Sequence, residues 1–189
     1  MFVTNVLSSH YPGSFTSALL DRFNAGLVEA GHEFVNFDLY GEEFDPVMKG
    51  DDFNQFFGKP IPEDIVRVQK VVAAADVLVF FYPVWWNDMP AIMKGWIDRV
   101  FSKGFAFDYD ESGTRGLLPC RRVILVCTLG NLADEMIPGL ERAMRDKERH
   151  GVFGYCGVSE VDHLFLYGVK DESARARYLD ELYDLGRRL

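Results

Sequence analysis

Two stretches of this sequence consist almost entirely of apolar residues, and each is about the length of one strand. They are DVLVFFYP, residues 76–83, and RRVILVCT, residues 121–128. Unbroken apolar runs are typical of strands covered on both faces, whereas half-exposed strands alternate apolar and polar residues. Helices on both sides of a parallel sheet provide such cover. The two runs therefore predict the centre of a parallel α/β sheet.

The rest of the sequence predicts the other strands and the helices of such a sheet. Strand patterns occupy residues 2–9, 32–40 and 161–169, and helical patterns occupy residues 16–30, 62–75, 90–101, 132–150 and 172–189. Pro138 and Gly139 are expected to break the fourth helical stretch, and residues 41–61 predict a long irregular connection. We expect one flavodoxin-like domain over residues 1–189, with a five-stranded parallel sheet in the order 2-1-3-4-5 and helices on both faces.

Composition and charge exclude several classes of protein. Of the 189 residues 48% are hydrophobic, enough to bury a core, and the formal net charge of −9 argues against binding of nucleic acid. The longest apolar run is too short to cross a bilayer, and the first residues lack a signal-peptide pattern. We therefore expect a cytoplasmic protein. His32, His150 and His163 lack metal-ligand spacing, so we expect no metal site and place them at the surface or at strand edges.

Three loops should carry the chemistry, because ligands of such sheets bind beyond the carboxyl ends of the strands. The first loop, within SSHYPGSFTSA (residues 8–18), brings hydroxyls and free backbone N–H groups to a helix start, which suits a phosphate group. It has neither a Walker sequence nor the glycine pattern of dinucleotide folds, which weakens kinase and GTPase interpretations. Ordinary N-capping by Ser14 or Ser17 is the alternative interpretation.

The second loop, YPVWWNDMP (residues 82–90), places Trp85 and Trp86 side by side before the helix that Pro90 opens. Indole rings are costly to leave in water unless a flat group covers them. A planar heterocycle would stack on them, with about 0.5–1.5 kcal/mol of stabilisation beyond area burial. The alternative is that both tryptophans belong to the core or to a dimer interface. The third loop, TLGN (residues 128–131), permits close approach of the backbone to a ligand.

Residues 83–107, PVWWNDMPAIMKGWIDRVFSKGFAF, closely resemble a motif of the NAD(P)H:quinone oxidoreductase (DT-diaphorase) family and its shorter bacterial relatives. These relatives include flavoprotein subunits of potassium efflux systems. Similar matches occur at HYPGSFTSA (10–18), GHEFVNFDLYGEEFDP (31–46) and RHGVFGYCG (149–157), so that the resemblance covers almost the whole chain. It implies a flavodoxin-like homodimer that binds FAD or FMN and reduces quinones and related small molecules with NAD(P)H.

The resemblance also implies roles for particular residues. It assigns the cofactor-binding role to His10, Ser14, Phe15, Thr16, Pro83, Val84, Trp85, Trp86, Asn87, Thr128, Leu129, Gly130 and Arg177. The substrate pocket would be formed by Trp86 with Phe107 and Tyr109, the last two reaching into the site of the partner subunit. Arg177 would hold the adenylate of FAD, which favours FAD over FMN, although it could equally be a solvated helix charge.

The chain departs from the resemblance at one point. Mammalian-type members carry a tyrosine and a histidine after the fourth strand, and Met136 and Arg142 occupy those positions here. We therefore assign no catalytic acid or base and expect the chemistry to belong to the flavin. Hydride would pass from NAD(P)H to flavin N5, and two electrons would then pass to a quinone in the same slot, giving ping-pong kinetics.

Three other functions are compatible with the same residues. The protein could be a regulatory flavoprotein subunit of a potassium-efflux-type transporter, which co-purification with a membrane protein would favour. It could be a flavodoxin-like electron carrier, which would stabilise a one-electron-reduced flavin. It could also bind no cofactor and use its aromatic residues only for packing.

Overall fold

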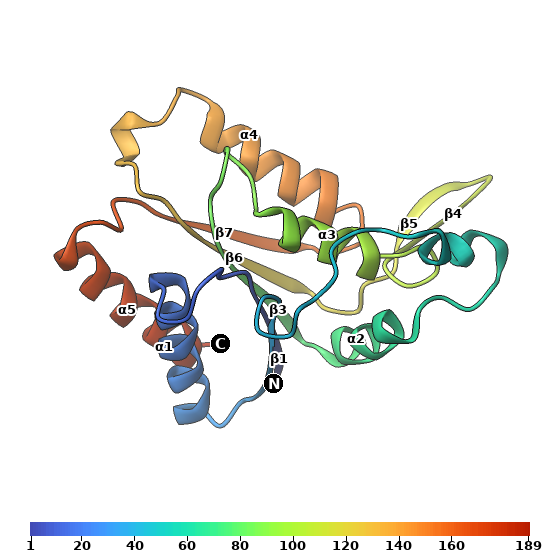
Figure 1. Cartoon of the computed structure of the whole chain (residues 1–189), viewed down its shortest axis with the longest axis horizontal. Coiled ribbons are helices and arrows are strands. Elements are labelled where there is room, and N and C mark those ends of the chain that lie inside the picture. Colours follow the sequence, from blue (N-terminus) through green and yellow to red (C-terminus); the bar gives the residue numbers. More distant parts are fainter.

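The computed structural model describes all 189 residues and contains the expected five-stranded parallel sheet. Its strands are β1 (Phe2–Leu7), β2 (Glu33–Asp38), β3 (Val77–Pro83), β6 (Arg122–Thr128) and β7 (Glu160–Leu166). They lie in the order β2-β1-β3-β6-β7, which is the predicted order when these five strands are counted along the chain (Figure 1). All neighbours are parallel, so the carboxyl ends of the strands meet at one edge.

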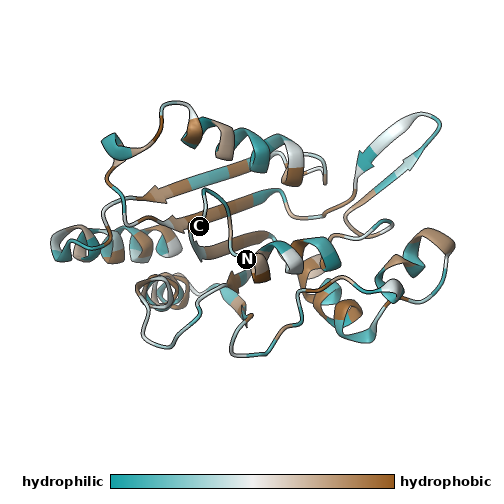
Figure 2. Cartoon of the chain, turned by 45° about the horizontal axis from the view of Figure 1, so that its top comes forward, coloured by the Kyte–Doolittle hydropathy of each residue, from teal (hydrophilic) through white to brown (hydrophobic).

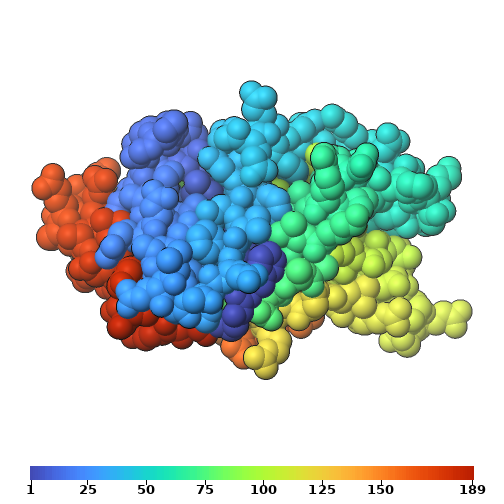
Figure 3. Space-filling model, turned by 90° about the horizontal axis from the view of Figure 1, so that it is seen from below, coloured from blue at the N-terminus to red at the C-terminus, as the bar shows by residue number.

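Helices cover both faces of the sheet. One face packs against α1 (Phe15–Glu29) and α5 (Glu172–Arg187), which lie side by side in Figures 1 and 3. The other face packs against α2 (Glu63–Ala74), α3 (Ala91–Val100) and the π-helix η3 (Lys147–Phe153), which continues α4 (Leu140–Asp146). Figure 2 shows the apolar strands between these helical layers. The prediction of helices on both faces is confirmed.

The central strands bury both of their faces, as their apolar sequences predict. In β3, Val79 and Phe81 belong to the apolar cluster beneath α1 and α5, while Phe80 and Tyr82 belong to the cluster beneath α3 and η3. All four side chains are at most 1% exposed. This alternation follows from the two-residue period of a strand, and it leaves the loop after Pro83 at the edge of the sheet.

The connection between β2 and α2 is more ordered than its composition predicts. It contains a 3₁₀-helix, η1 (Gly50–Phe57), in which Asp52 is buried and pairs with the Arg99 guanidinium on α3 at 3.1 Å. The helix α3 approaches this connection closely at Gly95, where a Cβ atom would lie 2.3 Å from the carbonyl oxygen of Pro46. Gly95 therefore marks a close packing contact, as expected from a glycine inside a helix.

One element was not expected, and one predicted break is confirmed. A short antiparallel hairpin of β4 (Phe107–Asp110) and β5 (Gly113–Gly116) projects from one end of the molecule, where no strand was expected (Figures 1 and 3). The stretch 132–150 is broken at Pro138 and Gly139 as predicted, into a 3₁₀ turn, η2 (Ala133–Glu135), and the helix α4. Gly139 has a φ of 85°, which glycine adopts without strain. None of the helices combines the length and the apolar character that a membrane span requires.

Candidate functional site

The first loop ends at Ser14, which caps α1 and leaves part of the helix N-terminus free. The Ser14 side chain accepts a hydrogen bond from the backbone N–H of Ser17 at 3.1 Å and also bonds the hydroxyl of Ser9. The backbone N–H groups of Phe15 and Thr16 donate to no protein atom. Capping and anion binding are thus compatible here, because the cap uses a different N–H group from those that remain available.

The first loop also contacts the other two. The Thr16 hydroxyl lies 3.1 Å from the hydroxyl of Thr128, the last residue of β6. The His10 ring lies 5.4 Å from the ring of Trp85, between their centroids. The structure thus brings the three predicted loops together at the carboxyl edge of the sheet.

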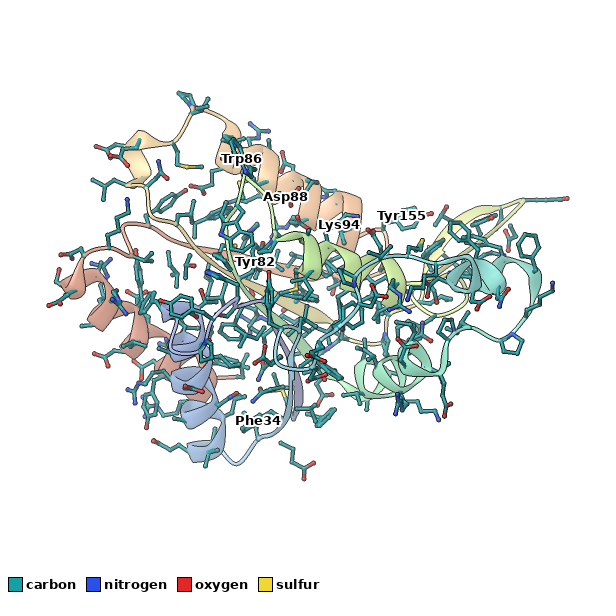
Figure 4. The ribbon with its side chains drawn as sticks, viewed as in Figure 1. Phe34, Tyr82, Trp86, Asp88, Lys94 and Tyr155 are labelled. Atoms are coloured by element: carbon teal, nitrogen blue, oxygen red, sulfur yellow. The ribbon has the colours of Figure 1, made fainter.

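The second loop contains a two-residue turn of unusual composition. The backbone of Trp85 and that of Asp88 exchange hydrogen bonds at 2.9 and 3.0 Å, and Trp86 and Asn87 between them have φ angles of 51° and 61°. Positive φ at both central positions is the type I′ arrangement, which favours asparagine and glycine and is strained for tryptophan. Trp86 is nevertheless 98% exposed, at the tip of the loop in Figure 4.

A cavity of about 330 Å³ lies between the Trp86 turn and the third loop. Its walls combine residues of the second loop, the third loop and the following segment: Val84, Trp86, Asn87, Leu129, Gly130, Asn131, Glu135, Met136, Ile137 and Leu140. Four backbone N–H groups at its rim, those of Trp86, Asn87, Gly130 and Asn131, donate to no protein atom. A slot with both apolar walls and free backbone donors suits a flat heterocycle with polar edges.

The remaining predicted residues lie outside this cavity within one chain. Phe107 and Tyr109 are on the β4–β5 hairpin, where Phe107 packs against Tyr155 with ring centroids 5.2 Å apart. Arg177, on α5, pairs with Glu181 at 3.4 Å and is mostly exposed. The arginine that reaches the first loop is Arg175, whose guanidinium lies 4.8 Å from the centroid of the Phe15 ring.

A buried polar cluster lies directly behind the second loop. The His163 Nε2 atom lies 3.3 Å from the Tyr82 hydroxyl and 2.9 Å from the Cys127 sulfur. His163 is only 7% exposed, so the expectation of a surface or strand-edge histidine is wrong. Burial lowers the pKa of His163 to about 3, helped by the positive charge of Arg145, and this histidine is therefore neutral in the folded protein. Burial raises the pKa values of Tyr82 and Cys127, so all three groups are uncharged at neutral pH.

Charged groups hold the second loop from the side of α4 and η3. The Lys147 Nζ atom lies 2.5 Å from a carboxylate oxygen of Asp88 and 2.9 Å from one of Glu148. Burial raises the pKa of Glu148 although the Lys147 ammonium opposes this effect. Burial also lowers the pKa of Lys147, but its hydrogen bonds to the two carboxylates outweigh this, so that the pKa of Lys147 is raised.

Several of these residues could not be identified from the sequence. Lys147 and Glu148 belong to a charged stretch whose pattern indicates only a solvated helix. Glu135 and Ile137 belong to the stretch 132–150, whose pattern predicts a helix and not the wall of a site. The one usable signal was position, since Asp88 and Asn131 lie within two residues of loop residues already predicted.

Comparison with known proteins places this geometry among related folds. Residues 3–185 match the family described as flavodoxin-like fold. An uncharacterized NAD(P)H oxidoreductase of Haemophilus influenzae is 31% identical over 167 residues, which cover 86% of this chain and 83% of the relative. NAD(P)H dehydrogenase [quinone] 1 of Cavia porcellus is 28% identical over 187 residues, covering 87% of this chain and 67% of that protein.

Solved structures agree with these sequence matches. The NAD(P)H:quinone oxidoreductase from Methanothermobacter marburgensis superposes with a TM-score of 0.91 at 30% sequence identity, covering 99% of this chain and 98% of that one. A structure described as a putative quinone reductase from Klebsiella pneumoniae has a TM-score of 0.88 at 28% identity, covering 97% of this chain and 83% of the other. The likeness therefore extends over the three loops as well as the sheet.

Proposed function

The chain belongs to the flavodoxin-like NAD(P)H:quinone oxidoreductase family, and from this premise we propose that it is a flavin-dependent enzyme that passes two electrons from NAD(P)H to a quinone or related acceptor. We further propose that residues 1–189 form one flavin-binding domain. The observation that carries the proposal is the cavity between the Trp86 turn and the third loop, which has both apolar and polar walls and free backbone donors at its rim.

The residues around this cavity fit a flavin. The free N–H groups of Phe15 and Thr16 would hold its phosphate at the positive end of the α1 dipole. The N–H groups of Asn87 and Gly130 would donate to the polar edge of the ring system, and the Trp86 indole would cover part of its face. Arg177 would hold the adenylate if the cofactor is FAD, and it would have no such role with FMN.

When bound, a flavin supplies the redox chemistry, since it accepts a hydride from NAD(P)H at N5 and returns the electron pair to an acceptor. The protein contributes binding and orientation. Leu129 and Met136 line the slot with apolar surface and exclude water from it. The Trp86 indole gives a flat wall against which a nicotinamide or a quinone can stack. Because donor and acceptor would use the same slot in turn, we expect ping-pong kinetics.

We also propose that the protein is a homodimer. Large apolar side chains are exposed on and beside η1, which lies at the same end of the molecule as the β4–β5 hairpin (Figures 1 and 3): Val47, Met48, Phe53, Phe56 and Phe57. Phe57 is 73% exposed, which is unusual for a side chain of this size facing water. Phe107 and Tyr109 on the hairpin would then reach the partner's slot. Phe57→Asp should lower the mass measured by light scattering to that of one chain.

Anaerobic titration of the reconstituted protein tests the proposed activity. FMN or FAD is added to the purified protein, and the dissociation constant is measured from quenching of flavin fluorescence. NAD(P)H should then bleach the visible flavin absorbance without a one-electron-reduced species, and menadione should restore it. Arg177→Ala should weaken FAD binding and leave FMN binding unchanged if the cofactor is FAD.

Each other outcome points to a different function. A flavin that binds but stays oxidised with NAD(P)H would contradict the enzyme and favour a regulatory flavoprotein. A stable one-electron-reduced flavin would favour an electron carrier. If neither flavin binds, the proposal is wrong.

A further inference from the structure

The Trp85–Asp88 turn is held in a conformation that its sequence does not favour. Trp86 is bulky and has a φ of 51°, and such backbone strain costs on the order of 1–3 kcal/mol per residue. Its indole makes almost no contact within the chain, since Trp86 is 98% exposed. Strained turns persist where surrounding structure fixes them. The contacts that fix this one must therefore come from its other residues.

Asp88 provides those contacts. Its carboxylate accepts from the backbone N–H of Met89 at 2.7 Å, which orients the side chain, and from the Lys147 ammonium at 2.5 Å. Lys147 lies 59 residues further along the chain, so this ion pair fastens the loop to the helical layer beside it. Figure 4 shows Asp88 below Trp86, on the part of the loop that runs toward α3.

Lys147 is itself oriented by a buried carboxylate. The Glu148 side chain is 3% exposed and receives one hydrogen bond from Lys147 at 2.9 Å, while its second carboxylate oxygen has no partner. The charges that act on Glu148 are the ammonium of Lys147, the carboxylate of Asp88 and, most weakly, the ammonium of Lys94. A buried carboxylate that lost its bond to Lys147 would be left charged and shielded from water, which is unfavourable. Glu148 therefore keeps the Lys147 ammonium close.

Lys147 and Glu148 lie at the start of a π-helix. The chain changes at Lys147 from the α-helix α4 to the π-helix η3. A π-helix makes its hydrogen bonds one residue further along the chain than an α-helix, and such segments are rare and frequent at functional sites. Adjacent residues of a helix point about 100° apart, so Lys147 is half-exposed toward Asp88 while Glu148 lies in the core.

We propose that Lys147 is a positioning residue, which holds the Trp85–Asp88 turn in its strained shape through Asp88 and is itself held by buried Glu148. This inference deepens the proposed function, since it rests on that turn forming one wall of the flavin slot. An ordinary surface ion pair would contribute little here. This group of three charged residues differs, because Glu148 is buried and Asp88 closes the turn.

Hydrogen exchange of the flavin-free protein tests the positioning directly. The amides of Trp85 and Asp88 are each other's backbone partners, so a peptide covering residues 83–90 reports on opening of the turn. Lys147→Met removes both ion pairs but keeps a long side chain, and we expect exchange in this peptide to become about fivefold faster or more. Lys147→Arg, which keeps the charge, should restore most of the protection.

A matched control separates this effect from loss of charge in general. Arg187→Met removes an exposed pair with Asp184 near the end of α5, at the opposite edge of the sheet, and should leave the peptide unchanged. If Lys147→Met also leaves it unchanged while the variant is folded by circular dichroism, the proposal is wrong. If Lys147→Met does not fold, Asp88→Asn gives the same test, because it removes the charge that pairs with Lys147 and keeps a side-chain oxygen that can accept from the Met89 N–H.

Flavin binding then separates this proposal from the proposed function. If the turn forms the slot, Lys147→Met should raise the flavin dissociation constant and the KM for the acceptor, with a smaller effect on kcat. Faster exchange with unchanged flavin affinity would keep the positioning role and remove the turn from the flavin site. Unchanged exchange with weaker flavin binding would contradict the positioning role and leave the proposed function intact.

Discussion

The hydroxyl groups of Thr16 and Thr128 lie 3.1 Å apart, although 112 residues separate them along the chain. Thr16 is in the first turn of α1 and Thr128 ends β6, so this contact joins the loop of the free helix N-terminus to the loop that borders the cavity. Both residues are buried. The two halves of the candidate flavin site are thus fixed to each other before any ligand binds.

This contact should be measurable as a coupling energy. Thr16→Val and Thr128→Val each remove one hydroxyl, and the double variant removes both. We expect the two single effects on the free energy of unfolding to exceed the combined effect by about 0.5–1.5 kcal/mol, the usual net value of a hydrogen bond. Urea denaturation of all four proteins gives this number. Strictly additive effects would mean that the two hydroxyls do not interact in solution.

Replacement of Trp86 should separate stability from binding. Trp86→Gly removes the strain of the positive φ angle and should stabilise the fold by roughly 1 kcal/mol, whereas Trp86→Ala keeps the strain and should change stability little. Both variants lose the indole, so both should bind flavin or acceptor more weakly. Thermal unfolding and flavin titration of the two variants check this. Unchanged flavin affinity and kinetics in both would remove Trp86 from the site.

The buried ion pair of Arg99 should be essential for stability. The Arg99 and Asp52 side chains are 4% and 1% exposed, and Arg99 also donates to the carbonyl oxygen of Asp45 at 2.8 Å. Arg99→Met would leave Asp52 charged and buried without its counter-ion, with only the backbone N–H of Lys49 donating to it, at a cost of about 3–5 kcal/mol. Lys94→Met, on the same helix, breaks only the exposed pair with Asp98 and should cost about 0–1 kcal/mol. Similar midpoints of urea denaturation for the two variants would contradict this prediction.

His163 should make the fold sensitive to acid. Its pKa is lowered by burial to about 3 in the folded protein, whereas in the unfolded chain it is near 6.5. The unfolded state therefore binds a proton that the folded state does not bind, and the free energy of unfolding decreases as the pH falls below 6.5. Each pH unit costs about 1.4 kcal/mol, or roughly 2 kcal/mol at pH 5.

His163→Gln stays neutral and should remove this part of the pH dependence. The difference in unfolding free energy between the variant and the unchanged protein should therefore shift by about 2 kcal/mol between pH 7.5 and pH 5, in favour of the variant at the lower pH. Carboxylates that titrate in the same range affect both proteins alike. A difference that is the same at both pH values would show that His163 takes up a proton in the folded state.

The sheet could be predicted because its signal is local. The apolar runs of β3 and β6 admit few environments other than the middle of a covered sheet, and the alternation with helices predicts that the sheet is parallel. The loop of phosphate size after the first strand then favours the observed strand order. The helix α1 follows in the same way, with Leu19, Phe23 and Leu27 buried on one side. The three loops were predictable from this topology alone, because they follow strands of known order.

The interior of the site could not be predicted, because it depends on contacts between distant segments. No local pattern distinguishes the buried Glu148 from its charged neighbours, since its burial depends on how η3 packs against the rest of the chain. His163 was misplaced for a related reason, because its burial comes from α4 and η3 packing over β7. In the β4–β5 hairpin, Phe107 and Tyr109 alternate with aspartates over only four residues and β5 has no large apolar residue, so the pattern is too short to identify two strands.

The π-helical turn that begins at Lys147 also limits how the chain can change in length. Each residue of an α-helix turns the chain by about 100°, so deleting one residue from this turn would let it rewind as an α-helix without shortening the helix much. Phe153 is held in the core against Phe80 and Phe101. Residues within the rewound turn would change their positions around the helix axis, so Lys147 and Glu148 would leave the places from which they contact Asp88 and each other. Shortening of this segment by a single residue would disconnect the helical layer from the tryptophan turn while leaving the sheet intact.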